Sequence, residues 1–212
     1  MGFCPSYILK MITSIVLAGG RSKRMGRDKA FLTYKNKTFL RNILETLDKI
    51  SSQIIISINK DKSLYLNEIK GLKNEIVFVK DLDEYAGPLN AVVSCYPYVK
   101  SEYVFLSTCD TPILNLDLIN FLKEEMERDK DIECIIPVVN GKYQPLNTFY
   151  RKSALKKAEE VYKMGNDSLF SWIDRLNKKY ISDKKLSKFD KDLKTYFSVN
   201  TPDLYKKLIS LE

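Results

Sequence analysis

The chain has 212 residues, of which 44% are hydrophobic and 29% are charged, so it can bury a core and is unlike a disordered chain. It carries 35 Lys and Arg against 27 Asp and Glu, a formal net charge of +8, and no histidine. The missing histidine excludes a Ser-His-Asp triad, a Cys-His dyad and the histidine-containing zinc sites of metalloproteases and deaminases. Any chemistry therefore depends on carboxylates, lysines, arginines, backbone amides or a metal ion held by oxygen.

Apolar strand-like runs alternate with helical patterns along the chain. The predicted strands cover residues 12–17, 53–58, 75–79, 103–106, 132–138 and 146–150. The predicted helices cover residues 38–50, 62–70, 88–96, 115–128, 153–164 and 169–176, with a last helix after Pro202 and a polar loop over 182–195. This alternation is typical of an α/β fold with a mostly parallel central sheet and helices on both faces. In such folds ligands bind beyond the carboxyl ends of the strands.

The first predicted strand runs directly into the sequence Leu17-Ala18-Gly19-Gly20. Two glycines let the backbone approach a ligand closely and adopt positive φ, and successive amides in such a loop form an anion-binding hollow. Five cations follow within nine residues, namely Arg21, Lys23, Arg24, Arg27 and Lys29. The segment matches neither the P-loop nor GxGxxG. We expect it to bind a triphosphate; the alternative is a basic surface loop after a strand.

Two acidic residues also follow predicted strands. Asp110 lies in Cys109-Asp110-Thr111-Pro112, and a carboxylate beside a bound triphosphate suits Mg²⁺, which prefers one or two carboxylates plus phosphate oxygens. The alternative for Asp110 is a helix N-cap. Asp81 follows the strand at 75–79 and could accept hydrogen bonds from a nucleobase. The alternative for Asp81 is a loop acid beside the Gly87-Pro88 turn, and the residues alone favour that alternative.

The cysteines and the surplus lysines limit where the protein acts and what it binds. Cys4, Cys95, Cys109 and Cys134 are far apart without a CxxC pair, which favours reduced core cysteines in a cytoplasmic protein. Residues 1–10 do not resemble a secretory signal, and no apolar run approaches the roughly 20 residues that cross a bilayer. We expect a flexible tail over 1–10, a single domain over 11–212 and no membrane contact.

The excess positive charge is mostly lysine and is spread along the whole chain. This distribution favours a solvated basic surface, with an anionic partner as the alternative. Neither an aromatic RNA-binding motif nor a compact Arg-rich stretch is present. We therefore expect no nucleic-acid partner, although a basic nucleic-acid-binding module remains an alternative whose binding would weaken steeply with salt.

In order and spacing, five segments resemble the molybdenum cofactor guanylyltransferases, a MobA-type nucleotidyltransferase family. They are LAGGRSKRMGRDK from Leu17, D…GPL from Asp81, CDTP at 109–112, QPL at 144–146 and VNTP at 199–202. The resemblance covers residues 12–208 and implies a Rossmann-like, three-layer nucleotidyltransferase fold with a mostly parallel central sheet. It also implies transfer of GMP from GTP to the terminal phosphate of Mo-molybdopterin, which forms the molybdopterin guanine dinucleotide cofactor and releases pyrophosphate.

The resemblance implies roles for individual residues on the nucleotide side. The residues that would line the guanine and ribose are Leu17, Ala18 and Gly19. Those that would lie along the phosphates are Gly20, Arg21, Arg24 and Lys29. Asp81 would read the nucleotide, and Asp110 would bind both the nucleotide and Mg²⁺. The residues expected to be catalytic are Arg24, Lys29 and Asp110.

On the acceptor side, the resemblance implies that Gln144, Pro145 and Asn200 border the pterin. Taken alone, Asn200 and Thr201 before Pro202 predict only a helix-capping turn. The resemblance also implies transient contacts with cofactor-synthesis proteins or with molybdoenzymes that receive the product.

The sequence departs from the family pattern at two positions. Ser57 stands where some members carry Asn, with Asn59 two residues later, and Asn90 stands at a helix start that is normally small. The alternative enzymes are a molybdopterin cytidylyltransferase and a sugar- or polyol-phosphate nucleotidyltransferase, which would share the glycine-rich segment.

Overall fold

The computed structural model describes residues 12–21 and 25–210. The expected tail over 1–10, Cys4 and the catalytic candidate Arg24 therefore lie outside the described residues.

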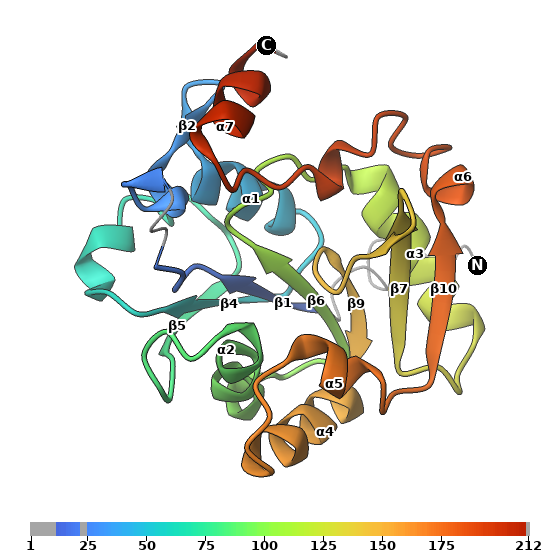
Figure 1. The fold of residues 1–212 in the computed structure, drawn as a ribbon. Coiled ribbons are helices and arrows are strands. Elements are labelled where there is room, and N and C mark those ends of the chain that lie inside the picture. The colour runs from blue at the N-terminus through green and yellow to red at the C-terminus, as the bar shows by residue number, and fades with distance from the viewer. Residues whose placement is uncertain (1–11, 22–24, 211–212) are drawn as a thin grey trace, which may run out of the picture.

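An 8-stranded sheet forms the centre of the molecule (Figure 1). Its strands lie in the order β10-β7-β9-β6-β1-β4-β5, with β8 paired to β7. The strands are β1 (Ile12–Leu17), β4 (Gln53–Ile58), β5 (Glu75–Lys80), β6 (Tyr103–Thr108), β7 (Cys134–Val139), β8 (Lys142–Tyr143), β9 (Thr148–Arg151) and β10 (Lys178–Ser182). The strands β6, β1, β4 and β5 run parallel, as do β10 and β7, whereas β9 is antiparallel to β6 and β7. The expected mostly parallel sheet is confirmed.

Helices cover both faces of this sheet. They are α1 (Phe39–Leu47), α2 (Pro88–Cys95), α3 (Leu116–Arg128), α4 (Lys152–Lys163), α5 (Leu169–Ile173), α6 (Asp183–Leu186) and α7 (Pro202–Ile209). The apolar sides of α1 and α3 pack on one face, and those of α2, α4 and α5 pack on the other, where Figure 1 shows them gathered below the strands. The result is the three-layer α/β arrangement that the strand and helix alternation predicts.

The alternation of side chains along β1 shows how both faces are buried. Val16 contributes to the layer under α1 and α3, and its neighbour Ile15 contributes to the layer under α2 and α4. Because both faces of a parallel sheet are covered, its strands are apolar throughout rather than on alternate residues. This explains the continuous apolar runs of the sequence, such as III at 54–56 in β4, a strand in which every residue is buried.

The register of the parallel strands brings several of their carboxyl ends together. Leu17 of β1 pairs with Ser57 of β4 on one side and with Thr108 of β6 on the other, and Ile58 pairs with Lys80 of β5. The segments that follow β1, β4, β5 and β6 therefore leave the sheet along one edge. From β6 to β5 this edge spans three strand spacings, roughly 14 Å.

Two local predictions are wrong, and two parts of the fold were not predicted. The expected helix over 62–70 is only a short 3-10 helix, η4 (Lys62–Tyr65), because a single residue of it, Tyr65, is buried. The expected loop over 182–195 contains α6 and a second 3-10 helix, η6 (Lys194–Tyr196). Strand β10 was not predicted, nor was the two-stranded sheet of β2 (Thr33–Tyr34) and β3 (Lys37–Thr38).

Two expectations from composition can be compared with the described residues. Cys95, Cys109 and Cys134 are free thiols in the core, as expected. Burial raises the pKa of all three thiols, which keeps them protonated and unreactive. Within residues 12–21 and 25–210, none of the helices has the length and apolar content needed to cross a membrane.

Candidate active site

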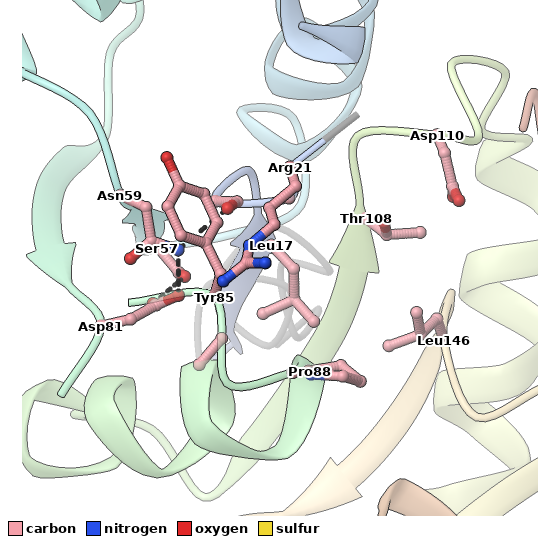
Figure 2. A pocket seen from close by; sticks show the side chains of 14 residues that line it. Leu17, Arg21, Ser57, Asn59, Asp81, Tyr85, Pro88, Thr108, Asp110 and Leu146 are labelled. Atoms are coloured by element: carbon pink, nitrogen blue, oxygen red, sulfur yellow. Dashed lines mark hydrogen bonds between the residues drawn. The ribbon is translucent and has the colours of Figure 1, made fainter. Parts of the chain in front are cut away.

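A cavity of 460 Å³ opens at the shared carboxyl edge of β1, β4, β5 and β6. Figure 2 shows Ser57, Asn59 and Asp81 at one end of it and Asp110 at the other, with Tyr85 and Arg21 between them. The residues that line it are Leu17, Gly19, Gly20, Arg21, Ser57, Asn59, Asp81, Tyr85, Gly87, Pro88, Ala91, Thr108, Asp110 and Leu146. This is the position at which open α/β sheets bind their ligands.

Asp81 lies at one end of the cavity and is held by Ser57 of β4 and by Asn59, which directly follows β4. Ser57 donates a hydrogen bond to its Oδ1 over 2.5 Å, and the amide nitrogen of Asn59 donates to its Oδ2 over 2.7 Å. Burial raises the pKa of the Asp81 carboxyl, and the two hydrogen bonds act against that rise. A carboxylate offers about four lone-pair sites, so two remain for a ligand.

Gly19 needs to be glycine because of Asn59, not because of its backbone angle. A Cβ atom built on Gly19 would lie 2.4 Å from Nδ2 of Asn59 and 3.0 Å from Oδ2 of Asp81. The amide of Asn59 also donates to the carbonyl oxygen of Gly19 over 2.9 Å. Gly19 and Gly20 are absent from the positive-φ glycines, so the expectation of positive φ in this turn is wrong. A Cβ atom on Gly20 would meet no atom within 4 Å.

A smaller cavity of 230 Å³ adjoins the first around Gly20 and Arg21 and is lined by both Lys29 and Asp110. The ammonium group of Lys29 lies 3.5 Å from Oδ2 of Asp110 and also donates to Oδ1 of Asn200. The two charged side chains are 20% and 23% exposed, so a ligand in the cavity can reach both. A lysine, a carboxylate and the glycine turn thus meet at one place, as the sequence predicts.

Asp110 does not cap a helix. Helix α3 begins at Leu116, and its N-cap is Asn115, whose side chain accepts from the backbone N–H of Leu118. The backbone carbonyl of Asp110 instead accepts from the N–H of Val199 over 2.7 Å. The helix-cap alternative is therefore excluded. The backbone of Asp110 instead holds the C-terminal segment at Val199 beside the cavity.

Asn147 supports the loop that carries Asp110, and the sequence analysis did not identify it. Its buried amide donates to Thr111 and to the carbonyl oxygen of Thr195, each over 2.7 Å, and accepts from Ser107 over 2.8 Å. Its φ is 57°, in the left-handed region that asparagine tolerates better than most residues. Asn147 therefore fixes the loop after β6 against the C-terminal segment.

The loop between β5 and α2 crosses the cavity beside the glycine turn. The guanidinium group of Arg21 lies 4.9 Å from the centre of the Tyr85 ring, a cation–π contact. Asn90 donates to the carbonyl oxygen of Asp83 over 2.6 Å, and Tyr162 donates to the Asp83 carboxylate over 2.5 Å. The unusual Asn90 thus stabilises this loop, and its side chain does not line the cavity.

Most of the predicted nucleotide-side residues that the structure describes lie together. The larger cavity is lined by Leu17, Gly19, Gly20, Arg21, Asp81 and Asp110, and the smaller one adds Ala18 and Lys29. Gln144 and Pro145 line neither cavity, although their neighbour Leu146 does, and Asn200 reaches the site through Lys29. The lining residues that the sequence reasoning did not single out are Tyr85, Ala91 and Thr108. Thr108 is the last residue of β6 and Tyr85 lies in the loop after β5, so their place at the carboxyl edge of the sheet is the signal that could have found them.

The donors available for a metal ion are oxygen atoms. Within the described parts of the chain, no three acidic or cysteine side chains form a cluster that could hold a metal ion without other ligands. Asp110 supplies one carboxylate that opens on both cavities. A single carboxylate beside a phosphate-bearing ligand is the usual protein contribution to a Mg²⁺ site, so the donor set fits that ion and not zinc.

Comparison with known families fits this geometry. The model of the MobA-like NTP transferase domain matches residues 14–179, which is most of the chain. The chain belongs to this family. It is therefore a nucleotidyltransferase, and this family membership confirms the resemblance seen in the sequence.

Two curated relatives of the MobA-like chain carry consistent names. A protein of Peptoclostridium acidaminophilum is 32% identical over 193 residues, covering 89% of this chain and 84% of the relative, and is named "Probable molybdenum cofactor guanylyltransferase". A protein of Syntrophotalea carbinolica is 29% identical over 199 residues, covering 94% of this chain and 91% of the relative, and is named "Molybdenum cofactor guanylyltransferase".

Solved structures show how widely the MobA-like fold is shared. The molybdopterin-guanine dinucleotide biosynthesis protein A of Archaeoglobus fulgidus matches with a TM-score of 0.78 at 24% identity, over 94% of this chain and 97% of that one. A 4-diphosphocytidyl-2C-methyl-D-erythritol synthase of Anaerococcus prevotii matches with a TM-score of 0.71 at 13% identity, over 95% and 98%. The fold thus serves different substrates, and the choice among them depends on the site.

Proposed function

We propose that this chain transfers GMP from GTP to the terminal phosphate of Mo-molybdopterin, which forms the molybdopterin guanine dinucleotide cofactor and releases pyrophosphate. The observation that carries the proposal is Asp81, a buried carboxylate at one end of the cavity with lone pairs left for a ligand. Guanine presents N1–H and the 2-amino group side by side as donors, which a carboxylate can accept together. The names of the full-length relatives support the same substrate.

The nucleotide would lie along the edge of the sheet from β5 to β6. Leu17, Ala18 and Gly19 would line the guanine and ribose, and Gly20 and Arg21 would lie beside the phosphates. The resemblance assigns Arg24, which lies outside the described residues, to the phosphates as well. This direction would place the phosphates toward Lys29 and Asp110, where positive charge and a carboxylate that could hold a metal ion lie together.

We assign the metal position to Asp110 and the ion to Mg²⁺. When bound, the ion would offset charge on the phosphate oxygens and orient them. Lys29 would contribute positive charge from the chain itself, and Asn200 would keep its ammonium group directed at the cavity.

The reaction requires little proton transfer by the protein. The terminal phosphate of molybdopterin attacks the α-phosphorus of GTP in line, the bond from the α-phosphorus to the bridging oxygen breaks, and pyrophosphate leaves. The attacking phosphate is largely ionised near pH 7, because its second pKa is about 6, so no histidine is needed as a base. Catalysis then depends on positioning and charge stabilisation, which Lys29 and Arg24 would supply at the leaving group.

The pterin would enter beside Leu146 and Pro88, opposite the base end of the cavity. Gln144, Pro145 and Asn200 would border it, with Tyr150 holding the first of these segments by donating to the carbonyl oxygen of Pro145 over 2.7 Å. Delivery of the product would involve transient contacts with cofactor-synthesis proteins or molybdoenzymes. We place this activity in the cytoplasm, as a single domain over 11–212, on the same grounds as in the sequence analysis.

Pyrophosphate release in the presence of Mo-molybdopterin tests the proposal. GTP should support turnover, and CTP should support much less. Preference for CTP would identify a cytidylyltransferase, and turnover with a sugar or polyol phosphate in place of molybdopterin would identify the other alternative enzyme. Tight, salt-sensitive RNA or DNA binding without turnover would instead indicate a nucleic-acid-binding module.

A further inference from the structure

The Asp81 carboxylate is held by two side chains, that of Ser57 in β4 and that of Asn59, which directly follows the end of β4. Ser57 donates to one of its oxygens over 2.5 Å, and Asn59 donates to the other over 2.7 Å. Both donors are buried, and Asp81 itself is only 7% exposed. Because each carboxylate oxygen has its own donor, neither oxygen can turn away without losing a hydrogen bond. The plane of the carboxylate is therefore fixed before any ligand binds.

Asn59 connects this carboxylate to the glycine turn. The same amide nitrogen that donates to Asp81 donates its second hydrogen to the carbonyl oxygen of Gly19 over 2.9 Å. The oxygen of the amide is buried and has no hydrogen-bond partner among the described residues. A buried acceptor without a partner is unfavourable, so the arrangement is not the best one for stability alone. Its evident effect is to place Asp81 and Gly19 at a fixed distance.

We propose that Ser57 and Asn59 are positioning residues for base selection, which orient the Asp81 carboxylate toward the guanine edge and couple it to the glycine turn at the ribose and phosphates. This inference rests on the proposed function, in which Asp81 reads guanine. It assigns a role to Ser57, which stands where some family members carry Asn, and to Asn59 two residues later. Ser57 acts through Asp81 and need not touch the base.

The selectivity follows from the donors of the bases. Guanine presents N1–H and an adjacent amino group, and a carboxylate in a fixed plane can accept both. Hypoxanthine presents N1–H but has no 2-amino group, so ITP forms one hydrogen bond fewer. A hydrogen bond to a charged group affects binding by roughly 10- to 150-fold. A carboxylate that can rotate would hold the second donor poorly and would lose part of this preference.

The protonation of Asp81 gives a second signature. Burial raises the pKa of Asp81, and the hydrogen bonds from Ser57 and Asn59 lower it. Removing either donor therefore raises that pKa further, and guanine binding should fail at a higher pH than in the unaltered protein. Tyr65, Cys95 and Tyr162 interact with the Asp81 charge and have raised pKa values, so they stay neutral near pH 7. The other charged groups that line the same cavity are Arg21 and Asp110.

Equilibrium binding of Mg-GTP and Mg-ITP to the full chain, measured by calorimetry between pH 5 and 8, tests the inference without needing the pterin. In Ser57→Ala and Asn59→Ala, the preference for GTP over ITP should fall about tenfold, and the pH below which GTP binding weakens should rise. Ser57→Thr, which keeps the hydroxyl, should retain most of the preference. Ser94→Ala is the matched control. Ser94 is a buried serine of α2 whose hydroxyl accepts from the backbone N–H of Leu82, the residue after Asp81, and does not bond the Asp81 carboxylate.

Asp81→Asn distinguishes a failure of the proposed function from a failure of the positioning role of Ser57 and Asn59. If this variant keeps the full preference for GTP, Asp81 does not read the base and the proposed function loses its main support. If Asp81→Asn removes the preference while Ser57→Ala and Asn59→Ala keep both the preference and the pH profile, the positioning role is overturned. Thermal unfolding identifies a variant that fails to fold; should Asn59→Ala do so, Ser57→Ala decides the question alone.

Discussion

Replacing Gly19 with alanine puts a methyl carbon 2.4 Å from Nδ2 of Asn59 and 3.0 Å from Oδ2 of Asp81. Favourable contacts between heavy atoms lie near 3.5–4.0 Å, so the overlap with the amide is about 1 Å. Asn59 cannot move without losing its hydrogen bonds to Asp81 and to the Gly19 carbonyl. Overpacking of this kind costs about 1–3 kcal/mol. For a chain of this length that cost lowers the melting temperature by roughly 2–12 °C.

Gly20→Ala is the matched substitution for stability, because a Cβ on Gly20 meets no atom within 4 Å and its φ is not positive. Thermal unfolding without ligand should therefore separate the two variants, with Gly20→Ala within about 1 °C of the unaltered chain. Gly19→Ala should also lose part of its preference for GTP over ITP, since the collision reaches Asp81. Equal melting temperatures for the two variants would refute the reasoning from the Asn59 contact.

Other predictions concern the reaction centre and its support. Lys29→Ala and Asp110→Asn should each lower turnover by about 10²–10³-fold with little change in melting temperature, because they remove preorganised charge at the transferring phosphate; near-normal rates of pyrophosphate release would contradict the assignment. Mg-GTP should raise the melting temperature more than Mg-CTP at equal concentration, and the reverse order would favour a cytidylyltransferase. Affinity for Mg-GTP should decline as the pH falls through the raised pKa of Asp81, since a protonated acid loses acceptor capacity, and a flat profile down to pH 4 would argue against this role. Asn147→Ala should lower the free energy of unfolding in urea by about 2–4 kcal/mol, because the hydroxyls of Ser107 and Thr111 lose their partner and alanine adopts a φ of 57° poorly. A loss below about 0.5 kcal/mol would show that other contacts hold the loop.

Strands buried on both faces could be predicted closely from the sequence. β4 runs from Gln53 to Ile58 as expected, since six consecutive buried residues leave a strong apolar signal between polar neighbours. β10 was missed because only Ile181 among its residues is buried, and its strand form depends on pairing with β7. The hairpin of β2 and β3 was missed because its turn uses positive φ at Lys35 and Asn36 without a glycine.

The candidate site could be predicted where its residues directly follow strands. Gly19, Asp81 and Asp110 line one cavity because the carboxyl ends of neighbouring parallel strands share one edge. The role of Asn59 could not be predicted from sequence, since it depends on the register that aligns β4 with both β1 and β5. The structural role of Asn147 could not be predicted for a similar reason, because its hydrogen-bond partners come from segments distant in sequence.

The most direct test is an experimental structure of the chain with GTP and Mg²⁺. The guanine edge should lie within hydrogen-bonding distance of the Asp81 carboxylate, and the metal ion should be bound to Asp110 with the phosphates beside Gly20 and Lys29. A nucleotide bound elsewhere, or one whose base lies away from Asp81 while Asp110 holds no metal, would contradict the assignment.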